Sequence, residues 1–109
     1  MTFDEYQRES RATAFYPNAG KNFIYPTLGV AGESGELANK VQKIIRDEEG
    51  AVSDIARENI RDEIGDVLWF LAQLATELNL SFGDIADSNM KKLLSRKERG
   101  VIQGSGDTR

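Results

Sequence analysis

The sequence predicts an all-α protein, built as an antiparallel four-helix bundle. Apolar residues recur at steps of three and four along much of the chain, which is the spacing of one helix face. Capping residues and turn formers divide the chain into four such stretches joined by short loops. No stretch has the strict alternation of apolar and polar residues that is typical of a half-buried strand.

The first predicted helix opens at Thr2, which can form a capping box with Glu5, and it ends before Pro17. The loop that follows is rich in turn formers but also holds two large rings, Phe23 and Tyr25. These rings either pack onto the bundle or line a ligand pocket.

The second helix is predicted from Pro26, which suits a first helical turn, to about Asp47. Glycine recurs at every third position in its first half, and each glycine weakens a helix by about 1 kcal/mol relative to alanine. We therefore expect another element to pack closely against these glycines, which are Gly29, Gly32 and Gly35.

The third helix is predicted from a cap at Ser53 to about Asn79. Its apolar residues repeat at alternating steps of four and three, which gives a stripe that should face the second helix. Trp69 lies about 180° from that stripe, so we expect a second subunit or a bound base to cover its ring.

Ser81 and Asp84 open the fourth predicted helix, which ends near Gly100. Four of its residues are expected to face inward: Phe82, Ala86, Met90 and Leu93. We divide the chain into one helical domain, residues 1–100, and a glycine-rich C-terminal tail, residues 101–109, that should not be helical.

Composition excludes several kinds of protein. The 109 residues carry a net charge of −4, which argues against a nucleic-acid-binding surface. The chain has no cysteine and no histidine, so thiolate zinc sites and catalytic pairs that use histidine are excluded. No apolar run is long enough to cross a membrane, and a cytoplasmic protein is expected.

Two short acidic motifs lie on the two central helices. Glu33 and Glu36 form the first, and Glu63 and Asp66 form the second. In each motif the acids lie about 60–70° and about 120–130° from the apolar stripe of their helix, in the same rotational sense. If two antiparallel helices pack through these stripes, both pairs emerge on the same side.

Four carboxylates on one rim would repel each other, and a hard divalent cation would relieve that repulsion. Ligands that are all oxygen suit Mg²⁺, with Mn²⁺ as a substitute. The alternative is that these are solvent-facing acids on ordinary helices. A glycine precedes the second acid of each motif, at Gly35 and Gly65, which would permit close approach of a backbone or a ligand.

Basic residues accompany the acids. Lys40 and Lys43 lie on the acidic side of the second helix, and we expect them to pair with Glu36 and Asp47 rather than to meet substrate phosphate. The fourth helix carries a polar and basic stripe that either holds phosphate or is a solvated face. The stripe consists of Asn89, Lys92, Arg96 and Arg99.

The two acidic motifs and their flanks resemble those of MazG-like nucleotide pyrophosphohydrolases, whose pattern is E-x-x-E, a spacer and then E-x-x-D. The flanking words that carry the resemblance are YPTLGVAGE at 25–33 and EIGDVLW at 63–69. Residues 89–100 match a downstream element, and GSGD at 104–107 resembles the ending of a small single-domain branch.

The resemblance implies an all-α enzyme that uses Mg²⁺ to hydrolyse (deoxy)nucleoside triphosphates to the monophosphate and pyrophosphate, usually as a homodimer or homotetramer. By position it gives the metal-ligand and catalytic roles to Glu33, Glu36, Glu63 and Asp66. Asn89 and Lys92 match positions that contact substrate, and Arg96 is a further phosphate candidate. The rings that could form a base pocket include Phe23, Tyr25, Trp69 and Phe70.

Two other functions are compatible with the same helices. A non-catalytic bundle that binds metal or nucleotide, in a regulatory role, would share the acidic rim but show no turnover. A structural interaction module would use the Trp69 face to assemble, and metal would not change its thermal stability.

Overall fold

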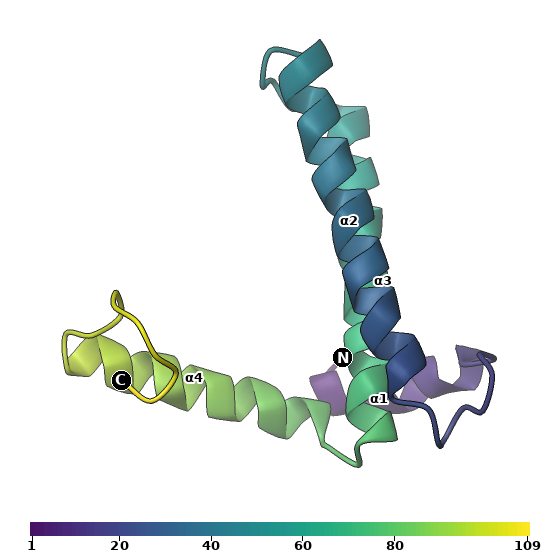
Figure 1. Ribbon diagram of the computed structural model, residues 1–109, viewed down its shortest axis with the longest axis vertical. Coiled ribbons are helices and arrows are strands. Elements are labelled where there is room, and N and C mark those ends of the chain that lie inside the picture. Colours follow the sequence, from purple (N-terminus) through teal and green to yellow (C-terminus); the bar gives the residue numbers. More distant parts are fainter.

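The computed structural model describes residues 1–109 and contains helices but no strand (Figure 1). The elements are α1 (Phe3–Ser10), a 3-10 turn η1 (Arg11–Thr13), α2 (Ile24–Asp47), α3 (Asp54–Glu77) and α4 (Phe82–Glu98). The predicted all-α class with four helices is confirmed. No helix has the combined length and apolarity that crossing a membrane requires.

Three of the four predicted helix starts are present, and α2 begins at Ile24, two residues before the predicted Pro26. The Thr2 hydroxyl accepts a hydrogen bond from the Glu5 amide, and the Glu5 side chain returns a bond to the Thr2 amide. Ser53 and Ser81 cap α3 and α4 with the first of these two bonds, because each hydroxyl accepts from a backbone amide three residues later. These bonds satisfy amides that the first turn of a helix leaves without partners.

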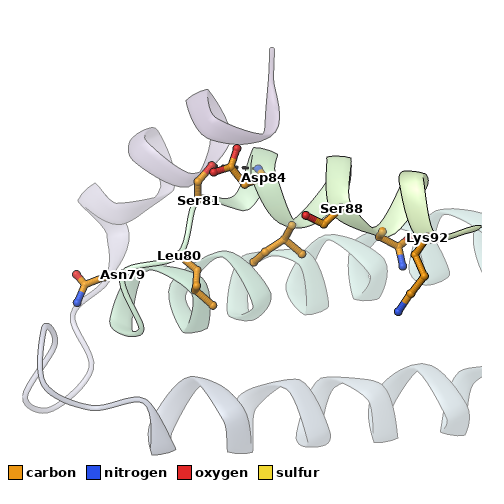
Figure 2. A pocket seen from close by; sticks show the side chains of 8 residues that line it. Asn79, Leu80, Ser81, Asp84, Ser88 and Lys92 are labelled. Atoms are coloured by element: carbon orange, nitrogen blue, oxygen red, sulfur yellow. Dashed lines mark hydrogen bonds between the residues drawn. The ribbon is translucent and has the colours of Figure 1, made fainter. Parts of the chain in front are cut away.

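The two long helices, α2 and α3, form an antiparallel hairpin, and α1 crosses its base (Figure 1). The fourth helix leaves from that same base and points away from the hairpin. A polar joint sets this direction: Asp4 accepts from the Ser81 hydroxyl and the Gly83 amide, and Gln7 accepts from the Phe82 amide. An open recess of about 540 Å³ lies along α4 beside the α3–α4 turn (Figure 2).

The core of the single chain is small and lies at the base of the hairpin. Only nine of the 109 residues are buried, and the largest apolar cluster joins Ala72, Ala75 and Phe82. Tyr6 of α1 packs against it. Because α1 and α4 meet α3 only at its C-terminal end, the rest of the hairpin has no third or fourth helix beside it.

Several residues expected to face inward are exposed for this reason. Met90 is 51% exposed and Leu93 is also exposed, because α4 diverges from the hairpin. Ile64 and Leu71 of α3, and Leu78 just after it, belong to the predicted apolar stripe and are likewise exposed, so only part of that stripe packs against α2. The predicted inward orientation is therefore wrong for these residues within one chain.

Trp69 is half-buried within the single chain, so the expectation that a monomer would leave its ring uncovered is wrong. The segment after α1 covers its ring in part, and its indole N–H donates to the Thr13 hydroxyl at 2.8 Å. Tyr16 packs edge-on against the same ring. The helical period gave the direction of this side chain, but it did not show that η1 crosses that face.

Close packing explains one of the three glycines of α2. A β-carbon at Gly29 would lie 2.3 Å from the Phe70 ring, so that ring can seat against α2 only because glycine is there. A β-carbon at Gly32 or Gly35 would meet nothing within 4 Å, and the same holds for Gly65 of α3. For these three, the predicted close neighbour is absent from the single chain.

The C-terminal tail is not helical, as predicted, and it folds back on the end of α4. The Arg109 guanidinium donates to the carbonyls of Val101, Ile102 and Gly106. Arg96, which is buried on α4, donates to the Asp107 carbonyl. Arginine side chains thus supply donors to backbone carbonyls that helix and sheet bonding leave free.

Candidate functional site

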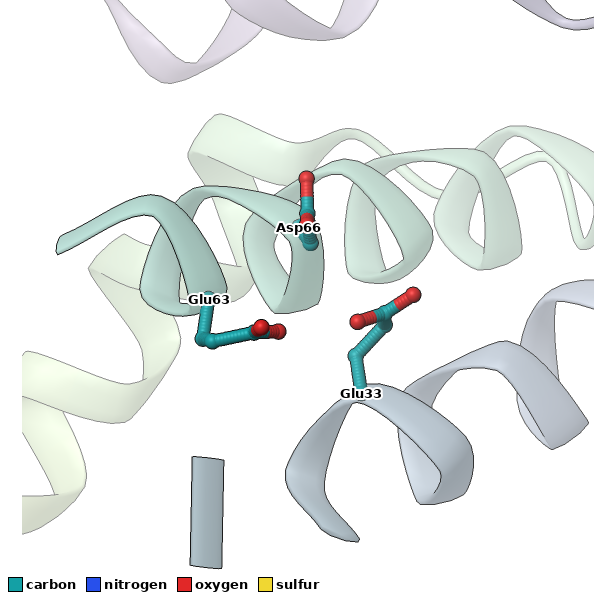
Figure 3. A group of neighbouring side chains, drawn as sticks. All are labelled: Glu33, Glu63 and Asp66. Atoms are coloured by element: carbon teal, nitrogen blue, oxygen red, sulfur yellow. The ribbon is translucent and has the colours of Figure 1, made fainter. Parts of the chain in front are cut away.

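Three of the four motif carboxylates converge between α2 and α3. One oxygen each from Glu33, Glu63 and Asp66 lies within 4.8 Å of the others (Figure 3). Glu33 lies 14 residues before the end of α2, and Asp66 lies 12 residues after the start of α3. In an antiparallel hairpin these positions reach similar heights above the loop, and the matched rotation of the two motifs turns their side chains to the same side.

Glu36, the fourth motif acid, lies outside this group of three. It is exposed to solvent, and its negative charge is still close enough to contribute to a raised pKa at Glu33. The structure therefore separates the four acids into a convergent trio and one neighbouring carboxylate.

Glu63 is the buried member of the trio, at 8% exposure. Its Oε1 lies 2.9 Å from the Lys40 ammonium, whereas its Oε2 is buried without any hydrogen-bond partner. The hydrogen bond from Lys40 lowers the pKa of Glu63. A buried carboxylate oxygen without a partner is costly, because it has lost its water and gained nothing in return.

The pKa of Glu33 is shifted in the opposite direction from that of Glu63. Partial burial raises its pKa, and the negative charges of Asp66, Glu63 and Glu36 raise it further. Folding has thus placed Glu33 where its ionised form is disfavoured, which is the pattern often found at functional sites.

These residues fit a hard divalent cation. The three carboxylates offer oxygen ligands only, which suit Mg²⁺ or Mn²⁺ and do not suit metals that require sulfur or imidazole. A cation among them would give the buried Oε2 of Glu63 the partner that it lacks and would remove the repulsion that acts on Glu33.

Apart from Lys40, which contacts Glu63, the basic candidates lie away from the trio. Asn89 and Lys92 line the recess along α4, where no acid of the trio contributes (Figure 2). Arg96, further along α4, is occupied by the tail carbonyl of Asp107. Lys40 and Lys43 line a smaller recess of about 240 Å³ between α2 and α3, beside the loop of the hairpin.

The aromatic candidates form a cluster at the base of the hairpin, with one exception. Tyr25 stacks on Tyr16 with ring centroids 5.0 Å apart, and Phe70 contacts both Tyr25 and Trp69. Phe23 lies outside this cluster and is 54% exposed. Tyr25 packs on Tyr16 but remains 43% exposed, and Phe23 faces solvent, so both rings stay candidates for a ligand pocket.

The Lys40–Glu63 pair is a feature that sequence reasoning missed. We expected Lys40 to pair with Glu36, and Lys43 with Asp47, but Lys40 crosses to α3 and Arg46 takes Asp47. The relevant signal was height along the hairpin: Lys40 lies seven residues before the end of α2, and Glu63 nine residues after the start of α3. Helical spacing along one chain segment cannot reveal such a cross-helix pair.

Residues 26–101 match the family described as the MazG nucleotide pyrophosphohydrolase domain. The whole chain is also similar to the "Gene 37 protein" of Mycobacterium phage L5, with 46% identity over 114 aligned positions that cover 100% of each chain. No solved structure matches the chain. The family match contains both acidic motifs and all of α3 and α4.

Proposed function

Because this chain belongs to the MazG nucleotide pyrophosphohydrolase family, we propose that it hydrolyses nucleoside triphosphates, with Mg²⁺, to the nucleoside monophosphate and pyrophosphate. One observation supports the proposal above all others. Three carboxylates from the two family motifs meet around a buried oxygen that has no partner. An all-oxygen donor set with an unfilled position is what a metal-assisted phosphoanhydride hydrolase requires.

In the proposed reaction, water attacks one phosphorus of the α–β phosphoanhydride. The bond to the bridging oxygen breaks, and that oxygen leaves with the other phosphate. Bound Mg²⁺ would neutralise the charge that builds up on the phosphate oxygens during this displacement. Glu33, Glu63 and Asp66 would hold it, because their oxygens converge.

Glu36 suits the role of general base. It lies next to the trio but outside it, so its carboxylate is free to accept the proton of the attacking water. Asn89 and Lys92 line the separate recess along α4, so they would contact the phosphates of a substrate held at the trio from another subunit, where Lys92 would stabilise the leaving pyrophosphate. Arg96 could do so only after it released the Asp107 carbonyl.

We also propose that the active form is a homodimer or homotetramer. The long hairpin and α4 expose apolar side chains that a single chain does not cover, including Leu28, Ile64 and Met90. Gly35 and Gly65 leave open space beside the acids where another backbone could approach. Sedimentation equilibrium would measure the mass independently of shape, and a monomeric mass would contradict this part of the proposal.

The proposal is tested with a panel of ribonucleoside and deoxyribonucleoside triphosphates, each with Mg²⁺, with Mn²⁺ and with chelator. Separation of the products distinguishes monophosphate plus pyrophosphate from diphosphate plus phosphate. We expect pyrophosphate that disappears with chelator and in the matched variant Glu63→Gln. A folded protein that binds Mg²⁺ but releases no product from any nucleotide would instead indicate a binding module. Nucleotide substrates would place the activity in the cytoplasm.

A further inference from the structure

The contact between Lys40 and Glu63 joins the two helices at the level of the acidic trio. The ammonium lies 2.9 Å from Oε1 of Glu63, and the Lys40 side chain is 34% exposed, so it reaches inward from the hairpin surface. This lysine belongs to neither acidic motif. The contact uses one carboxylate oxygen and leaves the other, Oε2, buried and without a partner.

A purely structural ion pair does not explain this arrangement well. Where a buried carboxylate serves only the fold, both of its oxygens are normally bonded, because an orphan oxygen costs free energy. Glu77 on the same helix follows that rule: its two oxygens accept from the amides of Gly20 and Asn22 and from Arg11. Glu63 instead has one fixed oxygen and one free oxygen.

We propose that Lys40 is a positioning residue that fixes Glu63 as a one-oxygen ligand for the divalent cation. The inference rests on the proposed function, since it assumes that the trio binds the cation. With Oε1 held by Lys40, the carboxylate cannot rotate freely, and Oε2 is the oxygen left for the metal. Carboxylates that bind metals are commonly oriented by such hydrogen bonds, and loss of an orienting partner weakens metal binding about 10- to 100-fold.

The direction in which metal affinity changes when Lys40 is removed distinguishes a positioning lysine from a competing one. A lysine beside three carboxylates also repels a cation, so a lysine that merely occupies the empty site would compete with the metal. Removing a competitor strengthens metal binding, whereas removing a positioning residue weakens it. The geometry favours positioning because Lys40 touches only one oxygen of Glu63 and no other acid of the trio.

The test is isothermal titration calorimetry with Mg²⁺, and separately with Mn²⁺, on the full chain without nucleotide. The variants are Lys40→Met, Lys40→Arg and Lys43→Met. Lys43 is the matched control, because it lines the same recess and loses the same charge but forms no ion pair. We expect Lys40→Met to weaken binding about 10- to 100-fold, Lys40→Arg to restore most of it, and Lys43→Met to change it less than about threefold.

Circular dichroism checks that each variant is folded. If Lys40→Met does not fold, Lys40→Gln replaces it: the amide can still donate to Oε1 but carries no charge, so metal binding should be weaker than that of both Lys40→Arg and Lys43→Met. In that case the ranking of Lys40→Gln below both Lys40→Arg and Lys43→Met supports the proposal, and an equal ranking overturns it.

Tighter or unchanged metal binding in Lys40→Met overturns the positioning role, and tighter binding would identify a competitor. That failure is distinct from failure of the proposed function. If the wild-type protein binds metal and Glu63→Gln does not, the metal site stands whatever Lys40 does. If the wild-type protein binds neither Mg²⁺ nor Mn²⁺, the metal site and the inference about Lys40 fall together.

Discussion

The number of hydrogen-bond donors around a buried carboxylate differs between the base and the middle of the hairpin. At the base, both oxygens of Glu77 are bonded: Oε1 accepts from the amides of Gly20 and Asn22, and Oε2 accepts from Arg11 at 2.7 Å. In the middle, Glu63 has a single donor, Lys40, and one bare oxygen. The two residues lie on the same helix and have nearly the same burial, since their side chains are 0% and 10% exposed.

The same contrast extends to the apolar neighbours. At the base, the Phe70 ring fills the space beside Gly29, and aromatic rings pack on one another. In the middle, Gly35 and Gly65 have nothing within 4 Å of an added β-carbon. At the base the polar groups and the space are filled within the chain, whereas in the middle they are not, and this difference supports the metal site proposed above.

The largest effect is expected on turnover. Replacement of Glu63 by Gln should lower pyrophosphate release at least about a hundredfold, because metal assistance contributes several kcal/mol to catalysis. The melting temperature of the metal-free protein should fall less than in a Glu77 variant, because Glu63 has one donor, Lys40, whereas Glu77 has three. Rate and thermal unfolding are measured on the same preparation. A variant that retains turnover would remove Glu63 from the site.

The corresponding substitution at the base of the hairpin, at Glu77, should lower the free energy of unfolding rather than turnover. Replacement of Glu77 by Gln leaves Arg11 without its anionic partner and weakens the bonds from the Gly20 and Asn22 amides. Breaking a buried ion pair costs about 3 kcal/mol or more. Urea unfolding followed by circular dichroism measures the loss, with Glu63→Gln as the control. If both variants unfold at the same urea concentration, the distinction between the two carboxylates is wrong.

Smaller effects on stability are expected from alanine substitutions at two glycines of α2. Alanine at Gly29 would force the Phe70 ring to move, and overpacking of this kind costs about 1–3 kcal/mol. Alanine at Gly32 meets open space in the single chain and should stabilise α2 by up to about 1 kcal/mol. Thermal unfolding of the two variants should therefore move in opposite directions. A stabilised Gly29→Ala protein would contradict the packing described for Phe70.

The pH dependence of stability should also differ between the two regions. The pKa of Glu77 is lowered, so its contribution is present above the unfolded value of 4.5 and is lost as pH falls through the lower folded value. The pKa of Glu33 is raised, so the metal-free protein loses stability as pH rises through that folded value. In chelator, Glu33→Gln should therefore melt above the wild type at neutral pH, and the gap should shrink below pH 4.5. A gap that does not depend on pH would contradict the raised pKa of Glu33.

Sequence periodicity predicted α2, α3 and α4 to within about two residues because it depends on local chemistry, whereas α1 ends at Ser10, well before the expected end at Pro17. The caps at Thr2, Ser53 and Ser81 are present, and the rotation of the two motifs correctly predicted that Glu33, Glu63 and Asp66 face one another. Both kinds of information lie within a few residues of the positions that they describe.

The relations between helices could not be predicted in this way. The direction of α4 depends on the bond between Asp4 and Ser81, which lie 77 residues apart in the sequence. The covering of Trp69 by Thr13 depends on a contact across 56 residues. The period of a helix fixes where a side chain points around its own axis, and it does not say which distant segment lies there.

The divergence of α4 also has a consequence for hydrodynamics. The radius of gyration of the chain is 16.8 Å, whereas a compact domain of this length has a value of about 13 Å. An isolated chain of this shape would elute from a gel-filtration column ahead of globular standards of its own mass. Elution volume alone would therefore overstate the number of subunits, and small-angle X-ray scattering can separate an extended single chain from a compact assembly.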